Sequence, residues 1–237
     1  MAHRSRNVVG CVVLLAAVAV AQPLPRVLII GDSISIGYTP IVKELLAGKA
    51  TVEHHEGNAA DSANVRAKID SWLAKGPFDV ITFNCGLHDL KYTAATTSHQ
   101  IGPEQYMENL PWIVNTLQET GAKIIWMTTT PIDDEHVKRG TFIRYEKDVV
   151  SYNDMATSNM MRMQVPVCDL HAVVMIAGFP NVIGPDGTHY TPAGYRLLAE
   201  TAGNEGEQKK HQEDLESAVR LARLDLGELQ GLPLPSQ

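Results

Sequence analysis

The sequence lacks the short motifs of the commonest metal and nucleotide sites. No C-x-x-C, H-E-x-x-H or G-x-x-x-x-G-K-[ST] occurs among its 237 residues, so zinc and nucleotide chemistry have no motif support. Positive charge is also scarce, because 20 Lys and Arg stand against 27 Asp and Glu, which gives a formal net charge of -7. This balance disfavours a nucleic-acid partner, since binding to phosphates needs a basic surface. The length suits one globular domain of roughly 200 residues.

Cysteine is equally scarce, with 3 in the whole chain. Cys11 lies in an apolar run near the N-terminus, whereas Cys85 and Cys168 lie in apolar segments that resemble strands. Cysteine is among the most buried residue types when it is not paired. The sequence therefore predicts two buried thiols rather than a disulfide.

A long apolar run occurs at the N-terminus. "MAHRSRN" carries two arginines and is followed by "VVGCVVLLAAVAVA", which is short for a membrane span. Small residues at 19–21 offer a cleavage site for signal peptidase. We expect a signal peptide over 1–21, with a membrane anchor as the competing interpretation. A secreted or periplasmic protein, without a stable membrane anchor after cleavage, is the corresponding expectation.

Strand-like and helical runs alternate after the signal segment, and the globular domain that they form is expected over 26–202. The segments predicted as strands are 26–30, 50–55, 78–86, 122–131 and 165–170. The segments predicted as helices are 40–48, 62–76, 103–121, roughly 144–163, and a last short one from Pro192. Strands that are apolar on both faces and separated by helices are typical of a parallel sheet covered on both sides. The fold class is therefore predicted as α/β, a three-layer α/β/α sandwich with a five-stranded parallel sheet.

The C-terminal segment 203–237 differs in character from the rest of the chain. It is dense in charge and ends in Gly and Pro residues, so we expect a surface helix with a frayed tail and assign it no chemistry.

Polar motifs follow several of the predicted strands. Ser33 comes after the first strand and Gly57 after the second, while "GLHD" (86–89) follows the third. Asp186 and His189 lie in "DGTH", just before the final helix. Because ligands of such sheets bind beyond the carboxyl ends of the strands, these motifs are expected to meet at one edge.

The Asp-x-x-His spacing gives the serine a possible role. Three residues apart on a turn, the Asp186 carboxylate can hold the Nδ1–H of His189 while Nε2 points toward Ser33. Taken singly, Asp186 reads as a turn residue and His189 as a loop histidine, and most loop serines cap helices. Together they form the arrangement that activates a hydroxyl nucleophile.

The ordered set resembles the SGNH hydrolases, the GDSL esterase/lipase family, over about residues 26–202. "GDSIS" resembles the nucleophile motif, "GLHD" the third motif and "DGTH" the Asp-x-x-His motif, with Gly57 at the oxyanion glycine. The resemblance implies a flavodoxin-like fold and acyl-ester hydrolysis without a cofactor or metal. Ser33, Asp186 and His189 would be catalytic, and Ser33, Gly57 and His88 would form the oxyanion hole. The absence of G-x-S-x-G speaks against an ordinary α/β-hydrolase.

One position departs from the family's pattern. The third motif usually reads Gly-x-Asn-Asp, and its Asn side chain donates into the oxyanion hole, but this chain has His88 there. An imidazole N–H could donate as a carboxamide does, provided that its other nitrogen finds a partner that fixes the tautomer. The alternative is that His88 only packs the loop.

These observations predict a secreted serine esterase that acts on small acyl esters, with O-acetyl groups on carbohydrate as a possible substrate. The alternatives are a lipase or thioesterase of the same family, and a non-catalytic carbohydrate-binding module on the same fold. A metal-dependent phosphoesterase would need His54, His55 and His88 together. Adjacent histidines on a strand are expected to point to opposite faces, which argues against joint ligation.

Two groups of residues are given structural interpretations. Asn153 and Asn159 fall on a polar helix and are expected to be solvated. Trp72, Trp112 and Trp126 are expected in the core rather than on a carbohydrate platform.

Overall fold

The computed structural model describes residues 22–93, 97–137 and 142–203. A five-stranded parallel sheet lies at its centre, with the strand order β2-β1-β3-β5-β7. The predicted α/β fold with five parallel strands is therefore confirmed. The strands are β1 (Arg26–Ile30), β2 (Thr51–His54), β3 (Val80–Phe83), β5 (Lys123–Met127) and β7 (Val167–Cys168).

The register brings the carboxyl ends of the central strands level with one another. Ile30 of β1 lies opposite Phe83 of β3, and Phe83 lies opposite Trp126 of β5. All three side chains are buried, so packing in the core fixes the ends of these strands. The loops that follow β1, β3 and β5 consequently leave the sheet at the same edge.

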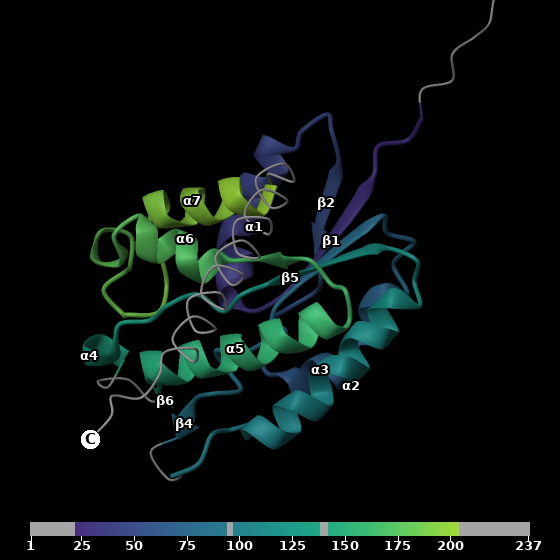
Figure 1. Cartoon of the computed structure of the whole chain (residues 1–237). Helices are drawn as coiled ribbons and strands as arrows, with labels where there is room; N and C mark the ends of the chain where they lie inside the picture. The colour runs from purple at the N-terminus through teal and green to yellow at the C-terminus, as the bar shows by residue number, and fades with distance from the viewer. Residues whose placement is uncertain (1–21, 94–96, 138–141, 204–237) are drawn as a thin grey trace, which may run out of the picture.

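Helices cover both faces of the sheet (Figure 1). On one face α1, α6 and α7 pack together, and on the other α2, α3 and α5 form a second layer. Each of these helices buries one apolar stripe and exposes polar residues, as expected for helices on a sheet. Their bounds are α1 (Ser33–Leu45), α2 (Ser62–Leu73), α3 (Pro103–Gln118), α5 (Glu146–Arg162), α6 (Leu170–Ile176) and α7 (Pro192–Gly203).

The start of α1 is the main difference from the predicted elements. A helix was expected over 40–48, but α1 begins at Ser33 and contains Pro40. The buried carboxylate of Asp32 caps this helix by accepting from the N–H of Ile34 at 2.9 Å. Packing against α7 then holds a segment whose local sequence disfavours a helix. The nucleophile candidate thus lies on a helix N-terminus rather than in a loop.

Several small elements were not predicted. A two-stranded antiparallel pair is formed by β4 (Tyr92–Thr93) and β6 (Phe142–Ile143). The short helices α4 (Asp134–Val137), α6 and η1 (Phe179–Asn181) were also missed, because elements this short carry little periodicity. Pro111 lies within a single continuous α3.

Other predictions can be compared with the described residues. Cys85 and Cys168 are free and buried, as predicted. Among the described helices, none is long and apolar enough to cross a membrane. The signal peptide expected over 1–21 and nearly all of the tail expected over 203–237 lie outside the described residues.

Candidate active site

The structure brings Ser33, His189 and Asp186 together at the carboxyl edge of the sheet. The Oγ of Ser33 lies 2.8 Å from Nε2 of His189, across 156 positions of sequence. Nδ1 of His189 lies 2.5 Å from Oδ2 of Asp186. Because the carboxylate can only accept, Nδ1 carries the proton and Nε2 is left to accept from the serine hydroxyl. This arrangement is what a hydroxyl nucleophile requires for activation.

Asp186 is held by more than the imidazole. Its Oδ1 accepts from the backbone N–H groups of Thr188 and His189, at 3.0 and 2.9 Å. Gly187 occupies the intervening position with φ of +72°, a left-handed conformation that glycine adopts without strain. Burial raises the pKa of Asp186, but the hydrogen bonds from His189 and Thr188 outweigh it and lower the pKa to about 2. The carboxylate is therefore ionised at neutral pH, as the orientation of an imidazolium requires.

Ser33 is placed at the N-terminus of α1, where backbone N–H groups are left without helical acceptors. Within the described residues, no hydrogen bond joins the N–H of Ser33 or of Gly57 to an acceptor. The helix N-terminus also favours negative charge. Gly57 has φ of +78°, again a conformation suited to glycine. The N–H of Ser33 is thus available to an anion beside the serine, and the N–H of Gly57 is likewise left without a described acceptor.

The loop that carries Gly57 is tied to the loop that carries Ser33. The carbonyl of Gly31 accepts from the N–H of Ala59 at 3.0 Å and faces Nε2 of His55 at 2.9 Å. Nδ1 of His55 faces the carbonyl of Glu56 at 3.0 Å, so this ring bridges the two loops. His55 is only 4% exposed, and its burial lowers the pKa of its ring.

The expectation that His54 and His55 point to opposite faces is wrong. β2 ends at His54, and beyond the strand the two rings lie side by side with centroids 4.5 Å apart. The ring nitrogens of His54 face Oγ of Ser35 and the carbonyl of His55, both at 2.7 Å. No group of three or more His, Cys, Asp or Glu suited to a metal ion occurs among the described residues.

His88 lies half-buried in the loop after β3, with its Nδ1 3.5 Å from Nζ of Lys91. An ammonium can only donate, so this contact places a lone pair on Nδ1 and the proton on Nε2. Burial lowers the pKa of His88, and Lys91 and Arg144 act in the same direction against the raising effect of Asp32 and Asp61, so the neutral ring is favoured. Asp89, the next residue, points elsewhere and accepts from the N–H of Ser62 at 2.9 Å. Lys91, which the sequence did not single out, is thus the partner that fixes the tautomer.

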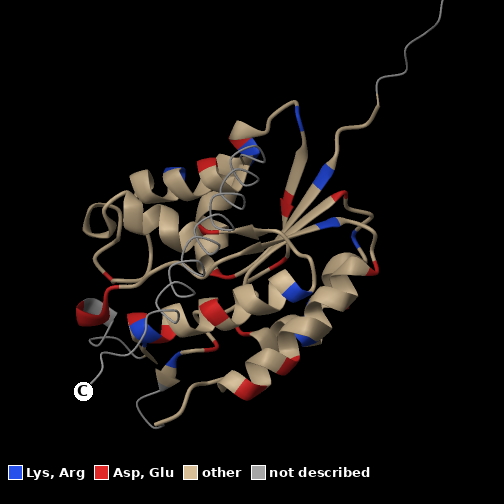
Figure 2. Ribbon diagram, viewed as in Figure 1, with Lys and Arg blue, Asp and Glu red and all other residues tan. Residues whose placement is uncertain are grey.

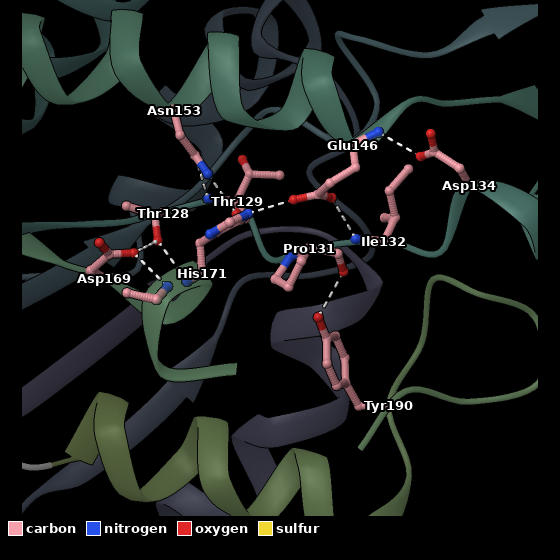
Figure 3. A network of polar contacts seen from close by, with 11 residues as sticks. Thr128, Thr129, Pro131, Ile132, Asp134, Glu146, Asn153, Asp169, His171 and Tyr190 are labelled. Atoms are coloured by element: carbon pink, nitrogen blue, oxygen red, sulfur yellow. Dashed lines mark hydrogen bonds and ion pairs between the residues drawn. The ribbon is translucent and has the colours of Figure 1, made fainter. Parts of the chain in front are cut away.

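A second polar network supports the loop that carries His189 (Figure 3). Glu146, at the start of α5, accepts from Nε2 of His171 at 2.6 Å and from the N–H of Ile132 at 2.9 Å. The preceding residue, Pro131, accepts from the hydroxyl of Tyr190 at 2.8 Å. Because Tyr190 directly follows His189, the network fixes the backbone on which the imidazole sits.

Two structural interpretations of single residues need correction. Asn153 is buried rather than solvated, and its amide accepts from the N–H of Thr129 and donates to the carbonyl of Thr129, both at 2.8 Å. Asn159 is buried as well. The polar composition of α5 concealed the face that packs on the sheet, so the sequence carried no direct signal for either residue.

The tryptophans divide between the core and the surface. Trp72 and Trp126 are buried as predicted, whereas Trp112 is 38% exposed and lies against Arg66. The tryptophan that was expected in the core thus forms a surface cation–π contact, 4.9 Å from guanidinium carbon to ring centroid.

Comparison with known families identifies the chain. The model of the GDSL-like lipase/acylhydrolase family matches residues 29–197, a range that includes Ser33, Gly57, His88, Asp186 and His189. The protein belongs to this family. As a GDSL-like hydrolase, it is a carboxylic ester hydrolase. A search of curated proteins finds no significant match.

Solved structures share the fold of this GDSL-like hydrolase at low sequence identity. A lipase/acylhydrolase from Enterococcus faecalis aligns with a TM-score of 0.65 and 18% identity, over 76% of this chain and 94% of that one. The acetyl xylan esterase AlAXEase aligns at 0.62 and 16%, over 75% and 97%. A single-substitution variant of Axe2, an acetyl xylan esterase from Geobacillus stearothermophilus, aligns at 0.62 and 17%, over 75% and 92%.

Proposed function

We propose that this GDSL-like hydrolase is a secreted serine esterase that hydrolyses small acyl esters, with O-acetyl groups on carbohydrate as its substrate class. The observation that carries the proposal is the chain of contacts from Ser33 through His189 to Asp186. The apolar N-terminal run and the small residues at 19–21 support export.

In the first half of the reaction, Ser33 Oγ attacks the ester carbonyl while Nε2 of His189 takes the hydroxyl proton. Asp186 keeps the ring in position and stabilises the imidazolium that forms. The carbonyl oxygen becomes an oxyanion, which the N–H groups of Ser33 and Gly57 and the Nε2–H of His88 would bind. The tetrahedral intermediate collapses when His189 returns the proton to the leaving alcohol, which leaves an acyl group on Ser33.

In the second half, water repeats the attack on the acyl-serine. His189 accepts a proton from the water, and the same donors bind the second oxyanion. Collapse releases the carboxylic acid and restores the Ser33 hydroxyl. No cofactor is required by these steps.

The acyl and alcohol parts of the substrate are proposed from similar structures and from the expected export of the protein. Two of the structurally similar proteins are described as acetyl xylan esterases, and one as a lipase/acylhydrolase. An exported enzyme that meets polymers outside the cell suits the removal of acetyl groups from carbohydrate.

The test is a screen of p-nitrophenyl esters from acetate to long acyl chains, run beside acetylated xylan. We expect the highest kcat/KM with acetate and release of acetate from the polysaccharide. Ser33→Ala, with its fold checked by circular dichroism, is the control and should abolish both. A preference for long chains would favour the lipase alternative, and full activity in the presence of a chelator would exclude the metal-dependent phosphoesterase.

A further inference from the structure

Two buried basic side chains lie beside the candidate oxyanion site, and the proposed mechanism uses neither of them directly. Lys91 and Arg144 are each 8% exposed, although long cationic side chains rarely lie so deep in a protein without an acidic partner. Nζ of Lys91 lies 4.2 Å from the centroid of the Phe142 ring and 3.5 Å from Nδ1 of His88. Among the described residues, neither side chain forms an ion pair with a carboxylate.

Arg144 leaves most of its hydrogen-bonding capacity unused. Its Nε donates to the carbonyl of Leu87 at 2.7 Å, which anchors the guanidinium against the 86–89 loop. No described residue accepts from either of its Nη nitrogens. These nitrogens are also not among the fully enclosed atoms that lack a partner, so each keeps some exposed surface. The planar guanidinium is thus held in place by Nε, while its two Nη groups have no described acceptor.

The anchor of Arg144 places this fork of donors beside the candidate oxyanion site, because Leu87, whose carbonyl accepts from Nε, directly precedes His88. Burial lowers its pKa, while the negative charges of Asp32 and Asp186 act in the opposite direction. Asp186 already uses both oxygens on His189 and Thr188, and Asp32 uses Oδ1 on the N–H of Ile34. Among the described residues, Arg144 therefore forms no ion pair with either carboxylate.

The positive charge is local rather than general. The chain as a whole carries a net charge of -7, and the outer helices display both signs (Figure 2). An anion that approaches this active site meets Asp32 and Asp186 as well, so it needs a cationic contact to be accepted there. A guanidinium offers two parallel donors that match the two oxygens of a carboxylate.

We infer that Arg144, with Lys91 beside it, forms a subsite that binds a carboxylate carried by the ester substrate. The inference rests on the proposed esterase function and narrows its substrate class to acidic esters, for which acetylated acidic sugars are the matching carbohydrate. Sulfate esters of a sugar present similar oxygens, so the experiment includes a sulfonate beside the carboxylate.

The test uses three esters with the same acetyl group. They are 4-acetoxybenzoate, its neutral methyl ester, and 4-acetoxybenzenesulfonate. The readout is the ratio of kcat/KM for each anionic ester to that for the methyl ester, which cancels general losses of activity. In Arg144→Gln we expect the carboxylate ratio to fall at least about tenfold, because charge-assisted hydrogen bonds are lost. A larger fall for the sulfonate would assign the subsite to sulfate and overturn the carboxylate assignment.

Two further variants test whether the effect comes from the paired donors of Arg144 or from the loss of a positive charge. Arg162→Gln removes the same charge from the exposed last turn of α5 and should leave the ratio unchanged. Arg144→Lys keeps the charge without the fork and should give an intermediate ratio. If Arg144 only supports the Leu87 carbonyl, Arg144→Gln lowers kcat/KM for all three esters by the same factor, and the inference is wrong.

A binding measurement keeps this result distinct from a failure of the proposed function. Calorimetry with Ser33→Ala should detect tighter binding of 4-acetoxybenzoate than of its methyl ester, and Ser33→Ala/Arg144→Gln should lose that difference. This preference does not depend on turnover, so it should be present even if none of the esters is hydrolysed. Equal binding of the two esters by Ser33→Ala would overturn the subsite, whatever the wild-type enzyme hydrolyses.

Discussion

Two histidine–carboxylate pairs lie at the same edge of the sheet, and they differ in what surrounds them. His189 and Asp186 approach to 2.5 Å with side chains 44% and 52% exposed, and His171 and Glu146 approach to 2.6 Å with side chains 19% and 29% exposed. The other ring nitrogen of His189 faces Ser33 Oγ, whereas no described hydroxyl contacts the other ring nitrogen of His171. An imidazole held by a carboxylate is thus common to both. A serine on a helix N-terminus distinguishes the pair that we propose is catalytic.

The second pair has a different task in the fold. Glu146 joins His171 to the N–H of Ile132, and the adjoining Pro131 carbonyl holds Tyr190. The His171–Glu146 pair therefore supports the loop that carries His189. Substitutions in the His189–Asp186 pair are therefore expected to lower kcat, and the same substitutions in the His171–Glu146 pair to lower stability.

The largest contrast is expected from the histidines. His189→Ala should lower kcat by about 10⁴-fold or more, since loss of the base disables the whole relay. His171→Ala should reduce kcat by less than about tenfold and lower the free energy of unfolding by about 1–3 kcal/mol, as a buried network loses a member. Steady-state kinetics and urea unfolding of the two variants measure the contrast. A similar loss of kcat in His189→Ala and His171→Ala would show that the two histidines do not have different roles.

The carboxylates should give a smaller contrast in the same direction. Asp186→Asn should lower kcat by about 10²–10⁴-fold, and less than His189→Ala, because solvent can partly orient the ring. Glu146→Gln keeps the shape of the side chain and should lower the melting temperature with little effect on kcat. Kinetics and thermal unfolding of the two amides test this ranking. Equal losses of kcat from Asp186→Asn and His189→Ala would contradict it.

A third histidine, His88, has no carboxylate partner among the described residues, and it extends the comparison. If the Lys91 contact leaves Nε2–H free to donate to the oxyanion, His88→Ala should lower kcat by about 10²–10³-fold with little change in KM. His88→Asn should recover much of that loss, because it restores the donor of the family's third motif. A loss below about fivefold in the alanine variant would leave His88 with a packing role only.

Asp89 is a carboxylate without a histidine, and it should affect stability rather than catalysis. Burial raises its pKa to about 7 from an ordinary 3.8, against hydrogen bonds from Ser62. The folded protein then binds more protons than the unfolded chain between these values, so the free energy of unfolding should fall as pH rises from 3.8 to about 7. The change is on the order of a few kcal/mol. Asp89→Asn keeps the acceptor for the Ser62 N–H and should flatten this part of the urea-unfolding profile.

Much of the fold could be predicted because the strands are nearly uninterrupted apolar runs. The predicted segment 26–30 coincides with β1 (Arg26–Ile30), and α7 begins at Pro192 as expected. The start of α1 could not be predicted, since the Asp32 cap and the packing against α7 outweigh the poor helix propensity of "GYTP".

The candidate site was predictable where its residues are close in sequence or belong to an ordered set of motifs. Asp186 and His189 are three residues apart, so their contact follows from a turn. Glu146 and His171 lie 25 residues apart and meet only because α5 and α6 begin at the same edge. Arg144 was missed for a similar reason, because its contact with Leu87 spans 57 positions and carries no local pattern.

The most direct test of the account is the labelling of the wild-type protein with a fluorophosphonate, followed by mass spectrometry of its peptides. We expect one phosphonyl group, on Ser33, with loss of esterase activity in proportion to labelling. The labelling rate should fall sharply in His189→Ala and remain close to wild type in His171→Ala. An adduct on another serine, or an active preparation that resists labelling, would contradict the assignment of Ser33 as the nucleophile.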